Sequence, residues 1–141
     1  MILVDLNVLI YATDRTSAHH EVARSWLERT ISSTETVGIP TAVAIGFVRL
    51  TTSHRIMRSP LDAGTSIGVV AGWYRRPNVT APQPTDRHFD LLAHLLDAVG
   101  TAGSLVPDAH LAALAIEHNA QLYSFDQDFQ CFSGLRWAVP A

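Results

Sequence analysis

Three aspartates stand where elements of the chain begin or end, and acidic side chains of this kind can bind a metal ion when they meet at one edge of a sheet. Asp5 follows a short apolar run at the start of the chain. Asp126 follows a second apolar run, with Asp128 shortly after it, and Asp108 opens an apolar helical segment. Mg²⁺ and Mn²⁺ prefer carboxylate oxygens as ligands. If folding brings these acids together, they predict a site for a hard divalent cation.

Short apolar strands alternate along the chain with helical segments, and these elements must position the acids. Strands are expected at residues 2–4, 37–40, around 79, 121–124 and 135–139. Helices are expected at residues 19–31, 41–52, 60–75, 86–99 and 108–118. This alternation predicts a three-layer α/β/α sandwich with a central, mainly parallel sheet of four or five strands, in a single domain over residues 1–141. Residues that follow parallel strands gather at one edge of such a sheet, so Asp5 and Asp126 should meet there.

The composition excludes several classes of protein. With 48% hydrophobic and 16% charged residues, the chain is too apolar to be disordered. The net charge of -3 neither indicates nor excludes a nucleic-acid partner, because local patches govern such binding. The one cysteine, Cys131, excludes an internal disulfide and a cysteine-based zinc site. Neither a secretory signal nor a membrane span is present in the pattern, so we expect a soluble, cytoplasmic protein.

Each acid also has a purely local interpretation, because aspartate caps helix amides and complements the helix dipole. That interpretation suits Asp108, in the first turn of a helix, and Asp128, at the start of a short turn. It suits Asp5 less, since Asp5 ends an apolar run only a few residues into the chain. Taken together, the sequence-distant acids favour a common site over separate caps.

Several segments resemble the PIN domain of the VapC toxin type, in the order and at the spacing of that family, over nearly the whole chain. These segments are residues 4–12, 46–52, 107–116, 124–129 and 134–137. The resemblance implies a PIN-like fold and a Mg²⁺- or Mn²⁺-dependent ribonuclease that cuts a structured cellular RNA. It also implies inhibition by a cognate VapB-type antitoxin and, often, a homodimer.

Residue by residue, Asp5, Asp108 and Asp126 match three metal-binding acids of that family, and Asp128 matches an auxiliary acid. The family's fourth acid is a glutamate ahead of a Phe-x-Arg stretch, and here that position is Gly46.

None of the four glutamates of the chain replaces the missing acid in the sequence pattern. Glu21 and Glu28 fall on the solvent side of the first expected helix, and Glu35 falls in a loop. Glu117 lies nine residues beyond Asp108, so at roughly 100° per residue it faces the opposite side of that helix. The departure at Gly46 fits a subfamily with a Gly-Phe-x-Arg motif and leaves open whether one or two ions bind.

Phosphodiester hydrolysis requires an acidified water and neutralisation of developing charge, and a divalent cation provides both. Asp5 and Asp126 are expected as direct ligands, with Asp108 as a ligand or as a base that holds a coordinated water. Asn7 and Ser124 are candidates for orienting the carboxylates through hydrogen bonds.

The basic stretch after the second expected helix offers arginines for the substrate. Arg49 and Arg55 are candidates for holding RNA phosphates, with Arg58 further along, although a solvated helix end explains the last two equally well. The seven histidines form no metal-ligand pair by spacing and are expected at surfaces or helix ends, with His110 pointing away from Asp108. The three tryptophans are expected to pack in the core or in an interface.

Two other functions remain open at this point. A catalytically degenerate PIN domain that binds RNA or a protein would explain Gly46. A small phosphatase or phosphotransfer domain would explain an aspartate after the first strand, but Asn7 stands where a second aspartate is needed, and the chain has no lysine.

The pattern also suggests surfaces for protein partners. An antitoxin segment is expected over the first two helices at Trp26, Phe47 and Val48, with a basic side chain reaching Asp5 and Asp126. Self-association is expected around Trp73 and Tyr74.

Overall fold

The computed structural model describes all 141 residues, and its centre is a sheet of five parallel strands in the order β3–β2–β1–β4–β5. The strands are β1 (Ile2–Val4), β2 (Val37–Gly38), β3 (Val79–Thr80), β4 (Gln121–Tyr123) and β5 (Trp137–Ala138). In the centre of the sheet, Ile2 of β1 lies opposite Val37 on one side and Gln121 on the other. Because β1 and β4 are parallel neighbours, Asp5 and Ser124 leave the sheet at the same edge. The predicted parallel sheet is confirmed, with five strands.

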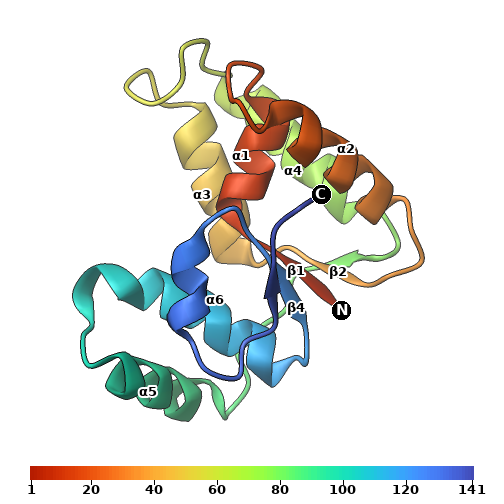
Figure 1. The fold of residues 1–141 in the computed structure, drawn as a ribbon. Helices are drawn as coiled ribbons and strands as arrows, with labels where there is room; N and C mark the ends of the chain where they lie inside the picture. Colours follow the sequence, from red (N-terminus) through yellow and green to blue (C-terminus); the bar gives the residue numbers. More distant parts are fainter.

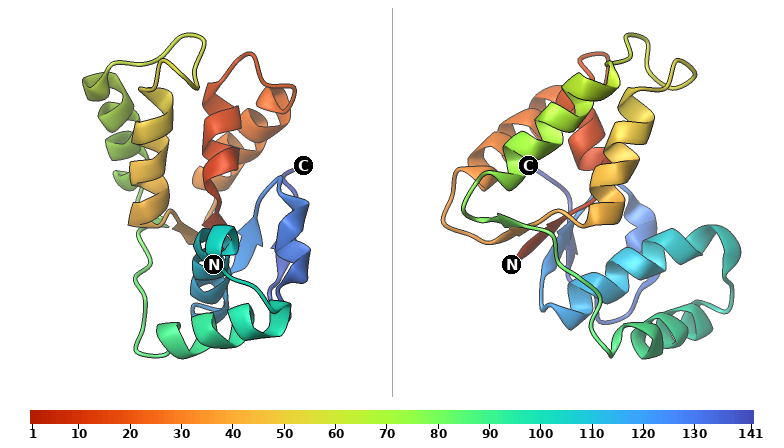
Figure 2. Two further views of the ribbon diagram at one scale, coloured as in Figure 1. Left: turned by 90° about the vertical axis from the view of Figure 1, so that its left-hand side faces the viewer. Right: turned by 180° about the vertical axis from the view of Figure 1, so that it is seen from behind.

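Six α-helices flank the sheet in two groups. They are α1 (Leu6–Thr13), α2 (His20–Ile31), α3 (Thr41–Thr51), α4 (Ala63–Tyr74), α5 (His88–Val99) and α6 (Val106–Glu117). Helices α1 to α4 gather on one side of the sheet and α5 and α6 on the other (Figures 1 and 2). Within the groups α1 packs against α2 and α3, α3 against α4, and α5 against α6. This is the three-layer arrangement that the sequence predicts.

The core lies along both faces of the central strands. Leu3, Val4, Val37 and Leu122 are fully buried, as expected for parallel strands that helices cover on both faces. Helix α6 brings small side chains to the sheet, and its buried alanines are Ala109, Ala112, Ala113 and Ala115. Small side chains let this helix approach the strands closely, which brings its first turn to the edge where β1 and β4 end.

The sequence pattern missed α1 altogether and placed some helix ends wrongly. Val8, Leu9 and Ile10 are all buried in α1, so no polar stripe reveals the helical period. Helix α4 begins at Ala63, later than expected, because the Asp62 side chain accepts a hydrogen bond from the Thr65 amide at 2.8 Å and caps it. Helix α6 begins earlier, at Val106, with Pro107 in its first turn. None of the helices is long and apolar enough to cross a membrane.

Candidate active site

Asp5 is held by two hydrogen bonds where β1 passes into α1. Its Oδ1 accepts the Leu6 amide at 2.7 Å and caps α1, while its Oδ2 accepts the Ser124 hydroxyl at 2.6 Å. The capping role, which the sequence favours less for Asp5 than for the other acids, is therefore present, because Asp5 caps a helix that the sequence did not predict. Burial raises the pKa of this carboxyl and the nearby Asp126 adds to the rise, against the lowering effect of the two hydrogen bonds.

Asn7 and Ser124 join the segments that follow β1 and β4. The Asn7 amide donates to the Ser124 hydroxyl at 3.0 Å, and its oxygen accepts the Phe125 amide at 3.2 Å. The buried Ser124 hydroxyl also accepts the Asp126 amide at 3.0 Å. Ser124 thus touches Asp5, Asn7 and Asp126 at once and fixes the spacing between the two acidic segments.

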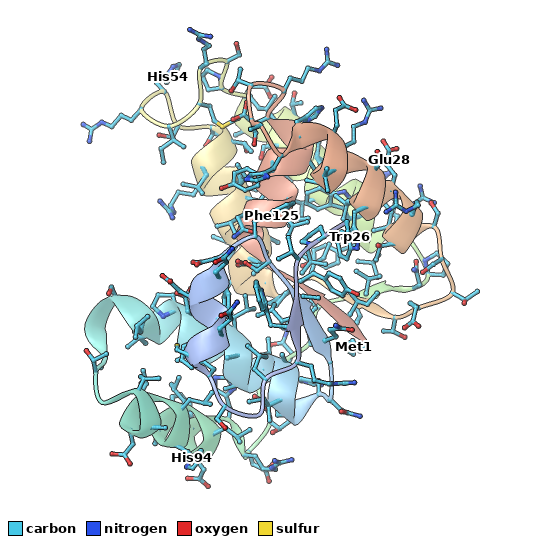
Figure 3. The ribbon with its side chains drawn as sticks, in the orientation of Figure 1. Met1, Trp26, Glu28, His54, His94 and Phe125 are labelled. Atoms are coloured by element: carbon cyan, nitrogen blue, oxygen red, sulfur yellow. The ribbon has the colours of Figure 1, made fainter.

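Asp126 and Asp128 lie on the turn that follows β4. The Asp126 side chain accepts the Asp128 amide at 2.9 Å and caps the short 3-10 helix η2 (Gln127–Cys131). Phe125, directly before Asp126, lies near the middle of the molecule (Figure 3). Asp126 is half-buried shortly after the end of β4, whereas Asp128 is exposed on the turn.

Asp108 shows that the acids influence one another. It lies in the first turn of α6, and burial raises its pKa to about 6, with further rises from the charges of Asp5, Asp126 and Asp128. Since sequence-distant acids contribute to this pKa, folding brings all four carboxylates into one electrostatic neighbourhood. Like charges that are gathered in this way favour a proton or a cation among them.

The donor set fits a hard divalent cation, although no closed coordination shell is in place. The acids supply only oxygen donors, and Asp5 and Asp108 line a cavity of about 230 Å³ beside them. No three Asp, Glu, His or Cys side chains are arranged to hold one ion as they stand, so the prediction that Asp5, Asp108 and Asp126 lie within reach of a common ion is not met. Mg²⁺ usually keeps several waters and binds through one or two carboxylates, so it does not need a complete protein shell.

Gly46 is enclosed in the structure, and Leu6 occupies the space next to it. A β-carbon at Gly46 would lie 2.8 Å from Leu6 Cδ2, so any side chain there requires Leu6 to move. Glu21, Glu28 and Glu35 are exposed and do not replace the missing acid. The apolar side chain of Leu6 therefore lies beside Gly46, the position at which the resembled family has a glutamate.

Neither of the two candidate substrate arginines forms an ion pair with the acids of the site. Arg49 is exposed on α3 and Arg55 is exposed in the following loop, and neither forms an ion pair with a carboxylate. His54, next to Arg55, lies at the opposite end of the α1–α4 layer from the strand ends (Figure 3). Arg49 therefore does not pair with a site acid, and its free guanidinium remains open to solvent.

Sequence reasoning missed a second polar cluster that reaches the same cavity. His88 is buried between α5 and α6, where its Nδ1 pairs with Glu117 and its Nε2 lies 2.8 Å from His110 Nδ1. His110 also lines the cavity of Asp5 and Asp108, but its Nδ1 contacts His88; burial lowers its pKa, and the charges that act on that pKa are those of His88 and Glu117, as expected for a side chain that points away from Asp108. Of this cluster, the sequence predicts only that Glu117 faces the opposite side of α6 from Asp108, since that follows from helix geometry.

His20 is buried as well, and its Nδ1 lies 2.9 Å from the Tyr11 carbonyl oxygen.

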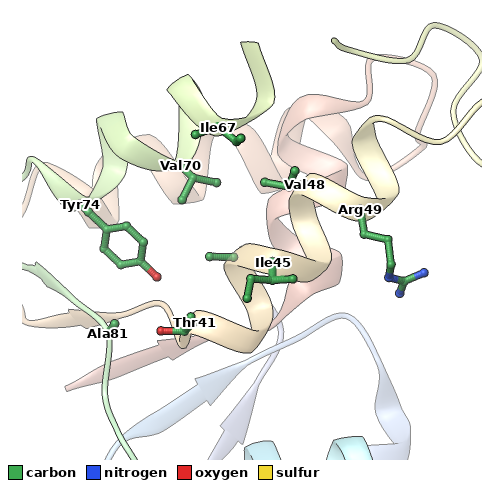
Figure 4. A pocket seen from close by; sticks show the side chains of 9 residues that line it. Thr41, Ile45, Val48, Arg49, Ile67, Val70, Tyr74 and Ala81 are labelled. Atoms are coloured by element: carbon green, nitrogen blue, oxygen red, sulfur yellow. The ribbon is translucent and has the colours of Figure 1, made fainter. Parts of the chain in front are cut away.

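A separate apolar groove of about 570 Å³ lies between α3 and α4 (Figure 4). Ile45 and Val48 of α3 face Ile67, Val70 and Tyr74 of α4 across it. Ile45 and Ile67 are 63% and 55% exposed, values that mark an uncovered apolar surface. Arg49 stands at the outer end of the groove, with its side chain directed away from Val70 and Tyr74 (Figure 4).

Two expectations about partner surfaces are wrong in detail. Trp26 and Phe47 are buried in the core and cannot line a docking surface, whereas Val48 does line the groove. Trp73 is also buried, and the Tyr74 hydroxyl donates to the Ile39 carbonyl at 2.6 Å. The aromatic pair at Trp73 and Tyr74 is therefore mostly core packing, and only Tyr74 reaches the groove.

Comparison with known proteins gives a consistent set of relatives. A family model described as PIN domain matches residues 2–134. Ribonuclease VapC37 of Mycobacterium tuberculosis is 44% identical over 140 residues, which cover 99% of this chain and 97% of that protein. The fold is similar to that of VapBC2 from Rickettsia felis, solved with a promoter DNA fragment, with a TM-score of 0.69, 16% identity and coverage of 99% and 98% of the two chains. It is also similar to that of Mycobacterium tuberculosis VapC20, described as a Sarcin-Ricin loop cleaving toxin, with a TM-score of 0.63, 20% identity and coverage of 96% and 99%.

Proposed function

The chain belongs to the VapC ribonucleases of the PIN-domain family, and on that premise we propose that it is a metal-dependent endoribonuclease, the toxin of a VapBC-type pair. The observation that carries the proposal is the shared electrostatic neighbourhood of Asp5, Asp108, Asp126 and Asp128. Carboxylates that repel one another at a cavity are stabilised by a cation, and hydrolysis of a phosphodiester is the chemistry that this cation supports.

Each residue of the site has a proposed role that follows from its contacts. Asp5 and Asp126 are direct ligands of Mg²⁺ or Mn²⁺, Asp108 is a third ligand or holds a coordinated water, and Asp128 adds negative charge. Ser124 and Asn7 orient the first two carboxylates through the hydrogen bonds described above. When bound, the cation would acidify a water and neutralise charge that develops on the phosphate.

The proposed substrate is a structured cellular RNA. VapC20, which shares the fold, is described as cleaving a structured loop, and this description suggests the substrate class without identifying the RNA. Arg49 and Arg55 carry unpaired guanidinium groups at the surface and are proposed to hold RNA phosphates through bidentate hydrogen bonds.

The proposed protein partner is a cognate VapB-type antitoxin that docks in the groove between α3 and α4. Its apolar segment would cover Ile45, Val48, Ile67 and Val70, which are otherwise open to solvent. A basic side chain of the antitoxin would extend to the acidic site and compete with the cation. A homodimer is proposed as well, on the strength of the family resemblance.

The enzymatic proposal is tested by RNA cleavage. Asp5→Asn and Asp126→Asn should each reduce cleavage of total bacterial RNA at least about 100-fold, because the amide keeps the size of the side chain but loses the charge that holds the cation. EDTA should abolish wild-type cleavage, and Asp97→Asn, an exposed acid of α5, is the matched control. Undiminished cleavage by either variant, or by the wild type in EDTA, would contradict the proposal.

Binding without cleavage would point to the second candidate function, a catalytically degenerate RNA-binding or protein-binding module. The specific observations that favour it are Gly46 and the lack of a closed three-residue shell. The deciding outcome is retention of transfer RNA or ribosomal RNA by a wild-type protein that cleaves neither in Mg²⁺ or Mn²⁺.

The partner proposal is tested by co-expression with the small protein encoded next to this chain. Expression of the chain alone should inhibit growth of a bacterial host, and the neighbouring protein should relieve inhibition and co-purify. Ile45→Arg should weaken co-purification, whereas Ile56→Arg, which is also exposed but lies outside the groove, should not. Equal co-purification of both variants would place the partner elsewhere.

A further inference from the structure

Three aromatic side chains, Tyr11, His19 and Phe125, form an aromatic cluster beside the acidic site. The rings of His19 and Phe125 are stacked with their centroids 4.6 Å apart. The centroid of the Tyr11 ring lies 5.2 Å from that of His19 and 5.4 Å from that of Phe125. His19 is exposed, and the other two are half-buried. Every other pair of rings in contact includes a buried side chain, so this cluster differs from the core aromatics in that all of its members reach solvent.

Two of the three rings belong to the segments that carry Asp5 and Asp126. Tyr11 lies in α1, the helix that Asp5 caps, and Phe125 directly precedes Asp126. The Asn7 side-chain oxygen accepts the Phe125 amide at 3.2 Å and joins the two segments. The contacts that position the acids therefore also set the position of the aromatic cluster.

A cavity of about 290 Å³ lies between the aromatic cluster and Asp5. Tyr11 and Asp5 both line this cavity, together with Asn7. Its other walls are apolar and are formed by Leu6, Ile10 and Leu50. A largely apolar cavity with an aromatic residue in its wall suits a flat ring with a few polar edges, and it offers no positive charge to a phosphate.

The aromatic cluster is supported from behind. Tyr11 and Phe125 pack against the hydrophobic core. His20 Nδ1 lies 2.9 Å from the Tyr11 carbonyl oxygen, which holds the start of α2, and with it His19, against α1. Because the rings are held in place before a ligand arrives, little conformational freedom is lost when a ligand stacks on them.

We propose that the aromatic cluster binds one unpaired base of the RNA, which stacks against Tyr11 beside Asp5 and presents the adjoining phosphodiester to the acidic site. The inference rests on the proposed ribonuclease function and deepens it, because it names an unpaired nucleotide as the part of the RNA that is recognised. Proteins recognise RNA loops largely through unstacked bases that pack on Phe, Tyr or His. Stacking needs no charge, so it contributes affinity at a place where carboxylates repel the RNA backbone.

A pair of substitutions at Tyr11 tests the stacking. In the Asp5→Asn background, which removes the proposed cleavage, Tyr11→Leu keeps apolar bulk without the ring, and Tyr11→Phe keeps the ring. Stacking of one base contributes about 5- to 150-fold in affinity, so Tyr11→Leu should raise the dissociation constant for a uridine octamer about tenfold, and Tyr11→Phe less than about twofold. Phe89→Leu, which removes a 77% exposed ring on α5, is the control and should change nothing.

An abasic octamer separates the base from the backbone. Ribose phosphate without bases keeps the charge of the uridine octamer, so Tyr11→Leu should not change its dissociation constant. Equal losses for the two octamers, or no loss for the uridine octamer, overturn the inference. If Tyr11→Leu abolishes co-purification of the neighbouring small protein and leaves binding of the uridine octamer unchanged, the aromatic cluster serves a protein partner and the inference is overturned as well.

A spectroscopic measurement keeps the inference testable if Tyr11→Leu does not fold. A fluorescent purine analogue in the middle of the uridine octamer loses emission when it stacks on an aromatic ring. Saturation with Asp5→Asn should quench this emission, and Phe89→Leu in the same background should quench it equally. Unchanged emission at saturation overturns the inference.

Octamer binding also separates this inference from the proposed function. If the wild type does not cleave RNA but binding of the uridine octamer depends on the Tyr11 ring, the catalytic proposal fails and the base site stands. If the wild type cleaves RNA and binding does not depend on that ring, the base site fails and the catalytic proposal stands.

Discussion

The two ends of α6 place a carboxylate in opposite environments. Near its start, Asp108 faces other acids, and burial together with their charges raises its pKa to about 6. At its end, Glu117 is enclosed but receives hydrogen bonds from Thr85 and His88, and its pKa is lowered. The same helix thus carries one carboxylate that lacks a partner and one whose partners are complete.

This difference separates a site that awaits a ligand from one that already holds the fold together. An enclosed acid with complete partners contributes to stability in the absence of any ligand. A group of acids without a cation lowers stability, and folded proteins keep such groups mainly where function requires them. Burial alone does not distinguish the two ends, because burial opposes ionisation at both.

The largest effect on stability is expected when Glu117 is removed. Its end of α6, where the carboxylate has partners, is called the paired end, and the end with Asp108 the unpaired end. Glu117→Ala removes the acceptor of the Thr85 amide and leaves His88 enclosed without its carboxylate. Loss of one member of a buried pair typically destabilises a protein by several kcal/mol, so we expect the free energy of unfolding to fall by about 3 kcal/mol. Urea denaturation followed by circular dichroism measures this change.

The control is Glu28→Ala, which removes an exposed pair with Arg24 within α2. The Arg24 Nε and Glu28 Oε1 atoms lie 2.9 Å apart in solvent, and such pairs add little to stability. If both variants unfolded at the same urea concentration, Glu117 would not belong to a stabilising cluster and the contrast between the two ends of α6 would be lost.

The sequence points to the acids of the unpaired end, but it does not point to the partners of the paired end. Asp5, Asp108 and Asp126 stand out because strand ends and helix starts can be recognised from apolar runs and from the family resemblance. His88 and Glu117 lie 29 positions apart on two different helices, and their meeting depends on how α5 packs against α6. His88 was expected at a surface or a helix end, and it does begin α5, but neither local spacing nor helical period predicts its burial against Glu117.

A smaller effect is expected when a carboxylate is added to the unpaired end. Gly46→Glu forces Leu6 to move, since the new β-carbon would lie 2.8 Å from Leu6 Cδ2. Crowding in a packed site costs about 1–3 kcal/mol, and replacement of a helical glycine returns up to about 1 kcal/mol, so we expect a net loss of about 1–2 kcal/mol in urea denaturation.

Leu6→Ala is the companion change, because it removes the atoms that the new side chain meets. The double variant should be destabilised by less than the sum of the two single changes, as residues in contact are not additive. If the glutamate reaches the site, isothermal titration should also show tighter Mn²⁺ binding. Strict additivity, with unchanged Mn²⁺ affinity, would show that this position does not face the acids.

The candidate site also shows that contacts between side chains of different helices cannot be predicted from the sequence. Gly46 looks like a missing acid in the sequence, whereas in the structure it is a close contact with Leu6, a residue of a helix that the pattern did not reveal. Similarly, Trp26 and Phe47 seemed available for an antitoxin because their helices could be predicted, but which face of each helix meets the sheet could not. The parallel sheet could be predicted because its short apolar strands alternate with helices along the chain.

The smallest effect is expected when one carboxylate is removed from the unpaired end, and it should depend on pH. The pKa of Asp108 is about 6 in the folded state against 3.8 as its ordinary value, so the folded protein binds its proton more tightly than the unfolded chain does. The associated stability is fully present below about pH 4 and is lost as the pH rises through 6. At pH 7.5 the wild type is therefore destabilised by an ionised Asp108, by about 1 kcal/mol after allowance for solvent that screens a half-buried group.

Asp108→Asn removes this repulsion, so its melting temperature at pH 7.5 should exceed that of the wild type by about 3 °C in EDTA, and the advantage should vanish near pH 4. Adding Mg²⁺ or Mn²⁺ should raise the melting temperature of the wild type more than that of the variant, because the cation replaces the proton among the remaining acids. Asp97→Asn, exposed on α5, should show neither response. A melting temperature of Asp108→Asn that stayed below that of the wild type at pH 7.5 in EDTA would mean that Asp108 has stabilising partners, and the two ends of α6 would then not differ.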